Sequence, residues 1–478
     1  MRTYSQIMHM AAPVRQIERL LAMLLLACVC AGCGGGPIAL MPTPNLYSSN
    51  QMNPFVEVPP PLQTTTIDAL YFTDRVPAVN PPDAPADLLN YGTERSRSVA
   101  FGISRIQFGP ENLTWDDLVK ISTHRERASG DIKLTVAKTS ELARFPNTPR
   151  SLIPPQATQP ASSPAAASTE PVWHPAYIGD EIPNAESIAA QEAFRKSMAE
   201  HMAASPVKEV YLFVHGYNNT FSDSVITVAQ MWHFLGRAGV PVAYSWPAGA
   251  SGLLRGYTRD SESSEFTVFH LKQCLRLIAS CPEVEKINIL AHSRGTAVTT
   301  SALRELHLEI AGSGRSTREV LKLGTLVLAA PDLDVDTVIQ RMMTVRLGRV
   351  PERFALYINK SDQALSMSNW LFGGITRLGA LDSKMFTAEE LAYARNEKSV
   401  QIIEARVSDT GAFGHDYFHS NPAVSSDIIL LMRYAYPPGA DSGRPLRLNP
   451  NGFWYIDDEY PGPPKTSMLE AVTKSKAP

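Results

Sequence analysis

Hydrophobic residues follow two patterns in the chain, one typical of buried strands and one typical of helices. Between residues 210 and 407, short and almost continuously apolar runs alternate with segments of helical period. Apolar runs of this length are typical of strands that are buried on both faces. The predicted strands are Val210–Val214, Val240–Ser245, Ile287–Ala291, Leu323–Ala330, Phe354–Ile358 and Val400–Val407. The predicted helices cover residues 222–239, 262–280, 295–311 and 334–347.

The alternation of strand and helix predicts an α/β fold. Parallel neighbouring strands need a crossover connection, which a helix usually supplies. We therefore expect a mostly parallel central sheet with helices on both faces. Three further strands, Ile67–Phe72, Val99–Phe108 and Ile132–Val136, are predicted in the N-terminal third.

Three regions show neither the apolar runs of strands nor the hydrophobic period of helices. Residues 34–65 start with three glycines and continue rich in proline, so we expect a tether that does not pack. Residues 148–171 are rich in Pro, Ala and Ser and are expected to be a loop or disordered insert. Residues 437–478 form a tail rich in Pro and Gly, of which Phe453–Ile456 is expected to dock on the body.

The first 33 residues have the pattern of an export signal. Three arginines precede the apolar run Leu20–Val29, which as a helix rises only about 15 Å and is too short to span a bilayer. Ala31 and Gly32 before Cys33 resemble a bacterial lipobox, in which the cysteine is lipidated; Cys28 is the alternative, and so is a plain secretory signal. We expect a cell-envelope lipoprotein held to a membrane, on its periplasmic or surface side, by a lipid on Cys33.

Composition narrows the possible functions. Lys and Arg number 44 against 47 Asp and Glu, so there is no basic excess for a nucleic-acid backbone, and no nucleic-acid partner is expected. The 478 residues, 44% of them apolar, suffice for a large core. After the leader only Cys274 and Cys281 remain, about 10 Å apart along a predicted helix, too far for a disulfide unless the helix ends between them.

A serine follows one predicted strand at the point where a helix begins. Ser293 stands between the strand Ile287–Ala291 and the helix 295–311, with Ala291 two residues before it and Gly295 two after it. Small residues in these places allow the sharp turn of a nucleophile elbow, although Ala291 replaces the usual first glycine. The alternative is a serine that caps an ordinary helix.

A second strand, Val210–Val214, ends in His215 and Gly216. An apolar strand that ends in His-Gly resembles the first oxyanion-hole segment of lipases and esterases. By that likeness, the oxyanion donors are the backbone N–H groups of Tyr217 and Arg294. A glycine turn beside a buried histidine is the alternative explanation.

Acid and base candidates follow later strands. Asp362 comes just after Phe354–Ile358, and Asp332, Asp334 and Asp336 follow the preceding strand as rivals. His415 lies on a glycine-containing loop after Val400–Val407 and is the preferred general base, with His419 as the alternative. These two histidines could also be metal ligands on one helical face, but neither the glutamate of a zincin nor a third ligand is evident, so no metal is expected.

The order of these motifs resembles that of bacterial α/β-hydrolases of unknown function, which are described only as esterase- or lipase-like. The likeness spans about residues 67–435. It is carried by Leu70–Arg75, Tyr91–Arg95, Phe213–Asn218, Ala291–Thr296, Ala329–Asp332 and Gly414–Phe418. The resemblance implies a single α/β-hydrolase domain over residues 66–436 that includes the N-terminal strands. In this fold the acid usually follows the second strand after the elbow, which favours Asp362.

The resemblance implies acyl transfer by a Ser293, His415 and Asp362 triad acting on a small-molecule or lipid ester, without a cofactor. It does not bring a substrate with it. A non-catalytic, hydrolase-like binding module of the cell envelope is the alternative, because a fold does not decide function.

Overall fold

The computed structural model describes residues 38–79, 89–124, 132–147, 185–250, 253–371, 376–381, 389, 399–408, 410 and 414–462. Residues 1–33, with Cys28 and Cys33, and the whole of the predicted insert 148–171 lie outside this part of the chain. None of the described helices is both long and apolar enough to cross a membrane.

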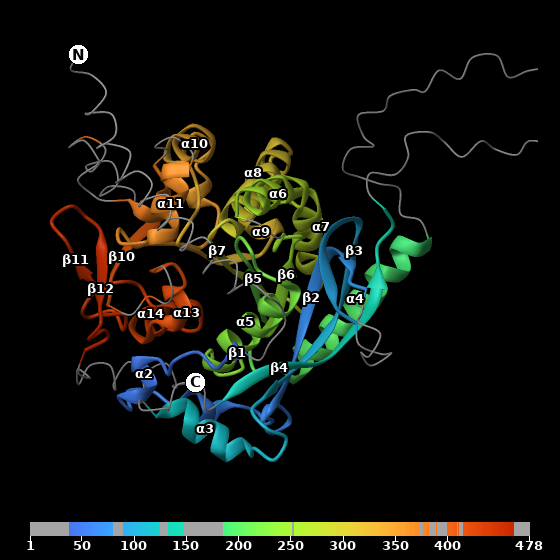
Figure 1. The fold of residues 1–478 in the computed structure, drawn as a ribbon, viewed down its shortest axis with the longest axis horizontal. Helices are drawn as coiled ribbons and strands as arrows, with labels where there is room; N and C mark the ends of the chain where they lie inside the picture. The colour runs from blue at the N-terminus through green and yellow to red at the C-terminus, as the bar shows by residue number, and fades with distance from the viewer. Residues whose placement is uncertain are drawn as a thin grey trace, which may run out of the picture.

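The described strands form one twelve-stranded sheet (Figure 1) in the order β1-β4-β3-β2-β6-β5-β7-β8-β9-β10-β12-β11. From β2 to β12 in this order, neighbouring strands run parallel, whereas β3, β4, β1 and β11 pair antiparallel. This confirms the predicted mostly parallel α/β sheet. Its strands are β1 (Ile38–Ala39), β2 (Thr66–Pro77), β3 (Tyr91–Phe108), β4 (Lys133–Arg144), β5 (Glu209–Val214), β6 (Val240–Ser245), β7 (Lys286–His292), β8 (Leu323–Ala329), β9 (Arg353–Ile358), β10 (Val400–Arg406), β11 (Arg447–Leu448) and β12 (Trp454–Asp457).

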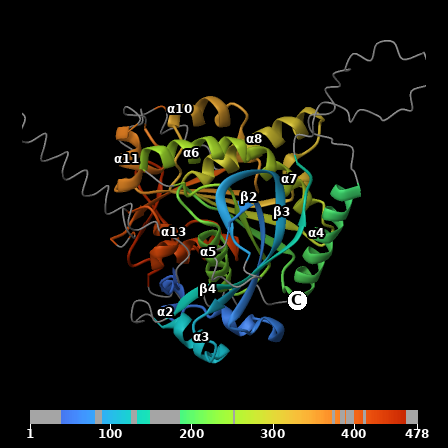
Figure 2. The same cartoon turned by 45° about the vertical axis from the view of Figure 1, so that its right-hand side comes forward.

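Helices cover both faces of the sheet, as Figures 1 and 2 show. In β5, Tyr211 and Phe213 pack with α5 and α14, while Leu212 and Val214 pack in a second core with α4, α7 and α8. Side chains alternate between the two faces of a strand, so an all-apolar strand serves both cores. The helices are α4 (Ala185–Ala204), α5 (Phe221–Phe234), α6 (Leu253–Phe266), α7 (Val268–Ala279), α8 (Gly295–Gly312), α9 (Thr317–Val320) and α14 (Pro422–Met432).

The smaller helices gather at the two ends of the sheet. In both views α10 (Val335–Val338) and α11 (Gln363–Leu371) lie with α6 at one end, and α2 (Asn45–Ser48) and α3 (Trp115–Thr123) lie at the other. α13 (Tyr417–Ser420) precedes α14. The first end holds the carboxyl ends of the parallel strands and is called the carboxyl edge below; the other is called the amino edge.

Two predicted helices differ from the structure. The helix expected over 262–280 is two helices, α6 and α7, separated at Thr267, whose hydroxyl donates to Asp74 and whose carbonyl accepts from Tyr244. The helix expected over 334–347 is confirmed only over residues 335–343: α10 passes into a π-helical turn, Ile339–Met343, and the chain turns at Arg346, which has φ 55°. A residue with left-handed backbone angles cannot continue a right-handed helix, so the helix ends before Arg346.

The expected tether does not fit residues 38–62, which pack on the body. Leu46, Tyr47 and Phe55 are buried, and the Tyr47 hydroxyl donates to the carbonyl of Phe234. Proline content misled the prediction, because Pro54 and Pro60 begin short 3₁₀ turns that need no donor there. The segment's few apolar residues then reach the core.

The described part of the tail also packs. β12 extends the sheet beside β10, so Phe453–Ile456 docks as expected. Arg444 forms a fully buried ion pair with Asp427 at 2.7 Å. The described cysteines, Cys274 and Cys281, are both buried, and neither forms a disulfide.

Candidate active site

Ser293 stands in the sharp turn between β7 and α8. Its φ of 51° lies in the left-handed region, which a residue with a side chain seldom adopts. A Cβ on Gly295 would lie 2.3 Å from the carbonyl oxygen of His215, so the chain can pass here only with glycine. The turn therefore has the strain and close backbone approach of a nucleophile elbow.

The start of α8 offers an unused donor behind this serine. Among the described residues, the backbone N–H of Arg294 has no hydrogen-bond partner. The Arg294 side chain turns away and donates from Nε to the Ser264 hydroxyl at 3.2 Å. An unused N–H at a helix start can bind an oxyanion.

The loop after β5 touches the elbow. A Cβ on Gly216 would lie 2.7 Å from the Ser293 Cβ, so the loop could not lie this close with a larger residue. The Gly216 N–H donates to the Asn219 side chain at 3.1 Å, and Asn218 has φ 58°. Tyr217, the other oxyanion candidate, therefore lies in a tight turn beside Ser293.

Two buried charged residues brace this loop. Asp260 accepts from the N–H of Asn218 at 3.0 Å and from that of Gly249 at 3.1 Å. The Arg75 guanidinium donates to the carbonyls of Asn219 and Ala248, both at 2.8 Å. Burial lowers the pKa of Arg75 to about 10. Nearby carboxylates, of which Asp74 has the largest effect, act in the opposite direction. The cation therefore stays charged while it fixes the loop.

The sequence analysis assigned no role to either of these residues. Arg75 follows a β-type run in a motif of the resemblance, and a charged pair at the end of an apolar run was the signal that could have found it. No local sequence pattern marks Asp260, because the backbone N–H groups that donate to it lie outside its own helix.

The candidate acid and the candidate base are in contact. His415 Nδ1 lies 2.7 Å from Asp362 Oδ2, and the Asp362 side chain is fully buried just after β9. The other carboxylate oxygen of Asp362 accepts from the N–H of Leu365. Burial lowers the pKa of His415, but the hydrogen bond and charge of Asp362, with Asp416 and Asp332, outweigh it and raise the pKa above its ordinary value.

The rival residues have other contacts. Asp332 accepts from the Tyr257 hydroxyl at 2.7 Å and pairs with Arg377 at 3.3 Å. Asp334 caps α10, and Asp336 is exposed in its first turn. His419 Nδ1 lies against the carbonyl of Asp416, and no group of three or more potential metal ligands occurs within the described residues.

One contact of a complete triad is absent. No hydrogen bond joins the Ser293 hydroxyl to His415 among the described contacts of either residue. Unliganded active sites often hold this bond long, and it tightens when substrate binds. Ser293 and His415 are linked indirectly instead, through His292, whose ring centroid lies 4.8 Å from that of His415.

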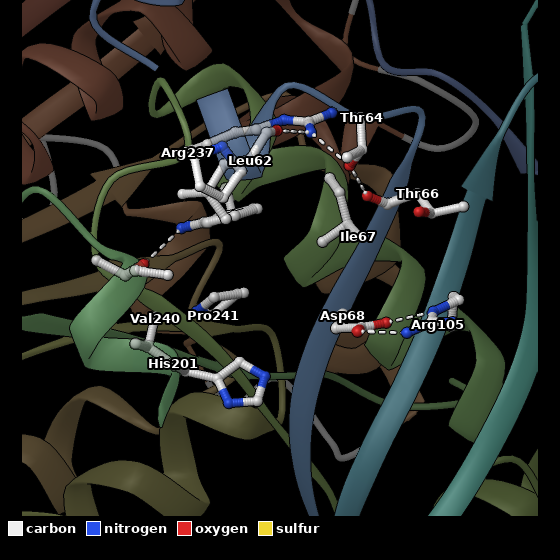
Figure 3. Close-up of a pocket in the computed structure, with 14 residues that line it drawn as sticks. Leu62, Thr64, Thr66, Ile67, Asp68, Arg105, His201, Arg237, Val240 and Pro241 are labelled. Carbon is white, nitrogen blue, oxygen red and sulfur yellow. Dashed lines mark hydrogen bonds and ion pairs between the residues drawn. The ribbon is translucent and has the colours of Figure 1, made fainter. Parts of the chain in front are cut away.

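A cavity lies away from this site, at the amino edge (Figure 3). Its volume is about 290 Å³, and it is lined where β2 and β6 begin, by residues that include Ile67, Asp68 and Val240. Arg237 forms part of its wall and donates to the carbonyl of Leu62. None of Ser293, Asp362 and His415 lines this cavity.

A mostly parallel sheet with a strained serine elbow at its carboxyl edge defines an α/β hydrolase. Residues 190–433 match a family described as alpha/beta hydrolase of unknown function (DUF900), and the chain belongs to this family. No curated protein and no solved structure matched the chain.

Proposed function

We propose that this α/β hydrolase is a serine hydrolase that cleaves carboxylic esters through an acyl-enzyme. The observation that carries the proposal is the strained Ser293 elbow, packed against a glycine loop at the same sheet edge as the bonded Asp362 and His415 pair. In this role Ser293 is the nucleophile, His415 the general base and Asp362 its acid partner.

The proposed chemistry needs only these side chains and water. His415 Nδ1–H donates to Asp362, which leaves Nε2 to take the Ser293 proton as Oγ attacks the ester carbonyl. The N–H groups of Tyr217 and Arg294 stabilise the oxyanion, and removal of one such donor typically costs about 10²–10³ in rate. His415 then gives its proton to the departing alkoxide, and water releases the acid by the same steps.

Export and anchoring are part of the proposal. The leader pattern supports cleavage before Cys33 and a lipid on that cysteine, with a small-molecule or lipid ester as substrate. Mass spectrometry of the mature N-terminus tests this directly. We expect a diacylglycerol-modified Cys33, and an unmodified terminus at another residue would contradict the anchor.

A fluorophosphonate probe tests the catalytic proposal. We expect labelling of the wild-type protein and none of the Ser293→Ala variant. His415→Ala should lose labelling, while the matched variant His419→Ala should largely keep it, because His419 does not contact Asp362. Labelling that depends on His419 instead would reassign the base.

One observation favours a second function, a non-catalytic binding module of the cell envelope. It is the missing hydrogen bond between Ser293 and His415. Folded wild-type protein that no fluorophosphonate labels would select this function over hydrolysis.

A further inference from the structure

We propose that His292 is a positioning residue, which holds the loop that carries the general base against the nucleophile elbow. The inference rests on the proposed function, since it assigns a role within the same site. His292 is the last residue of β7 and the direct neighbour of Ser293, so it is fixed by the central sheet.

The side chain of His292 contacts each of the other parts of the site. Its Nε2 lies 3.2 Å from the backbone carbonyl oxygen of His415. Its ring centroid lies 4.6 Å from that of Phe418, at the start of α13. On the other side, a Cβ on Gly216 would come within 3.3 Å of its Nδ1. The imidazole therefore fills the space between the loop after β5 with Gly216 and Tyr217, called the oxyanion loop, and the loop with Gly414 and His415, called the base loop.

The hydrogen bond has one possible direction. A carbonyl oxygen only accepts, so His292 Nε2 carries a hydrogen and donates a hydrogen bond to the backbone carbonyl oxygen of His415. His292 is only 5% exposed. Burial, and to a smaller extent the charge on His415, lowers the pKa of His292 to about 3. His292 therefore stays neutral at ordinary pH and does not compete for the proton that His415 takes from the serine.

Within the described residues, two hydrogen bonds tie the backbone of Gly414 and His415 to the strand ends. The Gly414 carbonyl accepts from the Asn359 side chain at 3.3 Å, and the His415 carbonyl accepts from His292. Two residues further on, the Tyr417 hydroxyl donates to the carbonyl of Tyr357 and accepts from the N–H of Ala330. Asp362 fixes the imidazole of His415 but not its backbone. Loss of the His292 donor should therefore let the base move relative to Ser293, and a displacement of about 1 Å can cost about 10²-fold in rate.

Two amide substitutions separate the donor from the rest of the side chain. The amide nitrogen of glutamine is as many bonds from Cα as Nε2 of histidine, whereas that of asparagine corresponds to Nδ1. His292→Gln can thus keep the donor in place, and His292→Asn cannot. His307 offers a matched control in α8, because its Nε2 also lies 3.2 Å from a backbone carbonyl, that of Val345, away from the site.

The first readout is the rate of fluorophosphonate labelling by the full-length protein. We expect His292→Asn to label about tenfold or more slowly than wild type, His292→Gln to stay within about threefold, and His307→Asn to label at the wild-type rate. Equal rates for His292→Asn and wild type, equally slow rates for the two amide variants, or an equal loss in His307→Asn would each overturn the inference.

The second readout does not need catalysis. NMR titration of the His415 imidazole should give a lower pKa in His292→Asn than in wild type, because a displaced loop weakens the bond to Asp362. The pKa in His292→Gln should match wild type. If wild type is not labelled at all, the proposed function fails, and this titration still decides the inference: a His415 pKa unchanged in His292→Asn overturns it.

Discussion

The two edges of the sheet each hold a buried arginine, and the two are partnered differently. At the carboxyl edge, Arg75 donates to backbone carbonyls of the loops around Ser293, with carboxylates nearby that favour its charge. At the amino edge, Arg237 lies over the ring of Trp115 at 4.6 Å, and burial lowers its pKa to about 9 with no opposing carboxylate. The cavity in Figure 3 lies at the amino edge, whereas the Ser293 turn and the bonded pair Asp362 and His415 lie at the carboxyl edge.

The backbone at the carboxyl edge is also strained. Residues with φ in the left-handed region at the carboxyl edge include Asn218, Ser293 and Ala330, each just past a parallel strand. Strain of this kind costs about 1–3 kcal/mol per residue and persists only where the surroundings enforce it. At the amino edge, Arg237 donates to the carbonyl of Leu62, so it ties the packed segment 38–62 to the rest of the fold.

The largest effect should come from the acid at the carboxyl edge. In Asp362→Asn the amide cannot stabilise the charged His415, so labelling should fall about 10³–10⁴-fold, as for other triads. Asp332→Asn is the matched variant, because Asp332 is also a buried carboxylate near Ser293 but bonds to Tyr257. Its rate should fall far less. A larger loss in Asp332→Asn, measured by the same probe, would move the acid.

How far the sequence predicted this site depends on the range of the contacts. The Ser293 turn follows from neighbouring residues, and the position of Asp362 after the second strand past the elbow follows from strand order. The contacts of Arg75 with Ala248 and Asn219 join residues far apart in sequence, so the local pattern can mark Arg75 but not its partners. The sheet was predicted because its apolar runs are local, whereas the packing of residues 38–62 is set by distant helices.

The next effect compares the two arginines directly. Arg75→Met leaves the carbonyls of Asn219 and Ala248 without a buried donor and frees the oxyanion loop, so labelling should fall about tenfold to a hundredfold. Arg237→Met should lower the melting temperature but keep labelling within about twofold.

Thermal melts and labelling rates on both variants separate stability from activity. If Arg75→Met does not fold, Arg75→Lys keeps the charge with fewer donors and should show a smaller loss of rate. Equal losses of labelling at the two edges would contradict the assignment of their roles.

The pH dependence should follow the carboxyl edge. His415 must be neutral to accept the serine proton, and its pKa lies above the ordinary value near 6.5. Labelling should therefore rise about tenfold per pH unit at low pH and level off above a midpoint higher than 6.5. Arg237→Met should leave the midpoint unchanged. A midpoint below 6.5 would mean that Asp362 does not outweigh the burial of His415.

The smallest effect is expected at the rim of the amino-edge cavity. Arg105 donates to both carboxylate oxygens of Asp68 at 2.7 Å, but the side chains are 54% and 34% exposed. Water and salt screen such a pair, so Asp68→Asn should cost about 0–1 kcal/mol of unfolding free energy and no labelling. Urea unfolding at low and high salt measures the first, and the probe measures the second. A change in labelling would show that the two edges are coupled through β2, which carries both Asp68 and Arg75, and the separation drawn between them would fail.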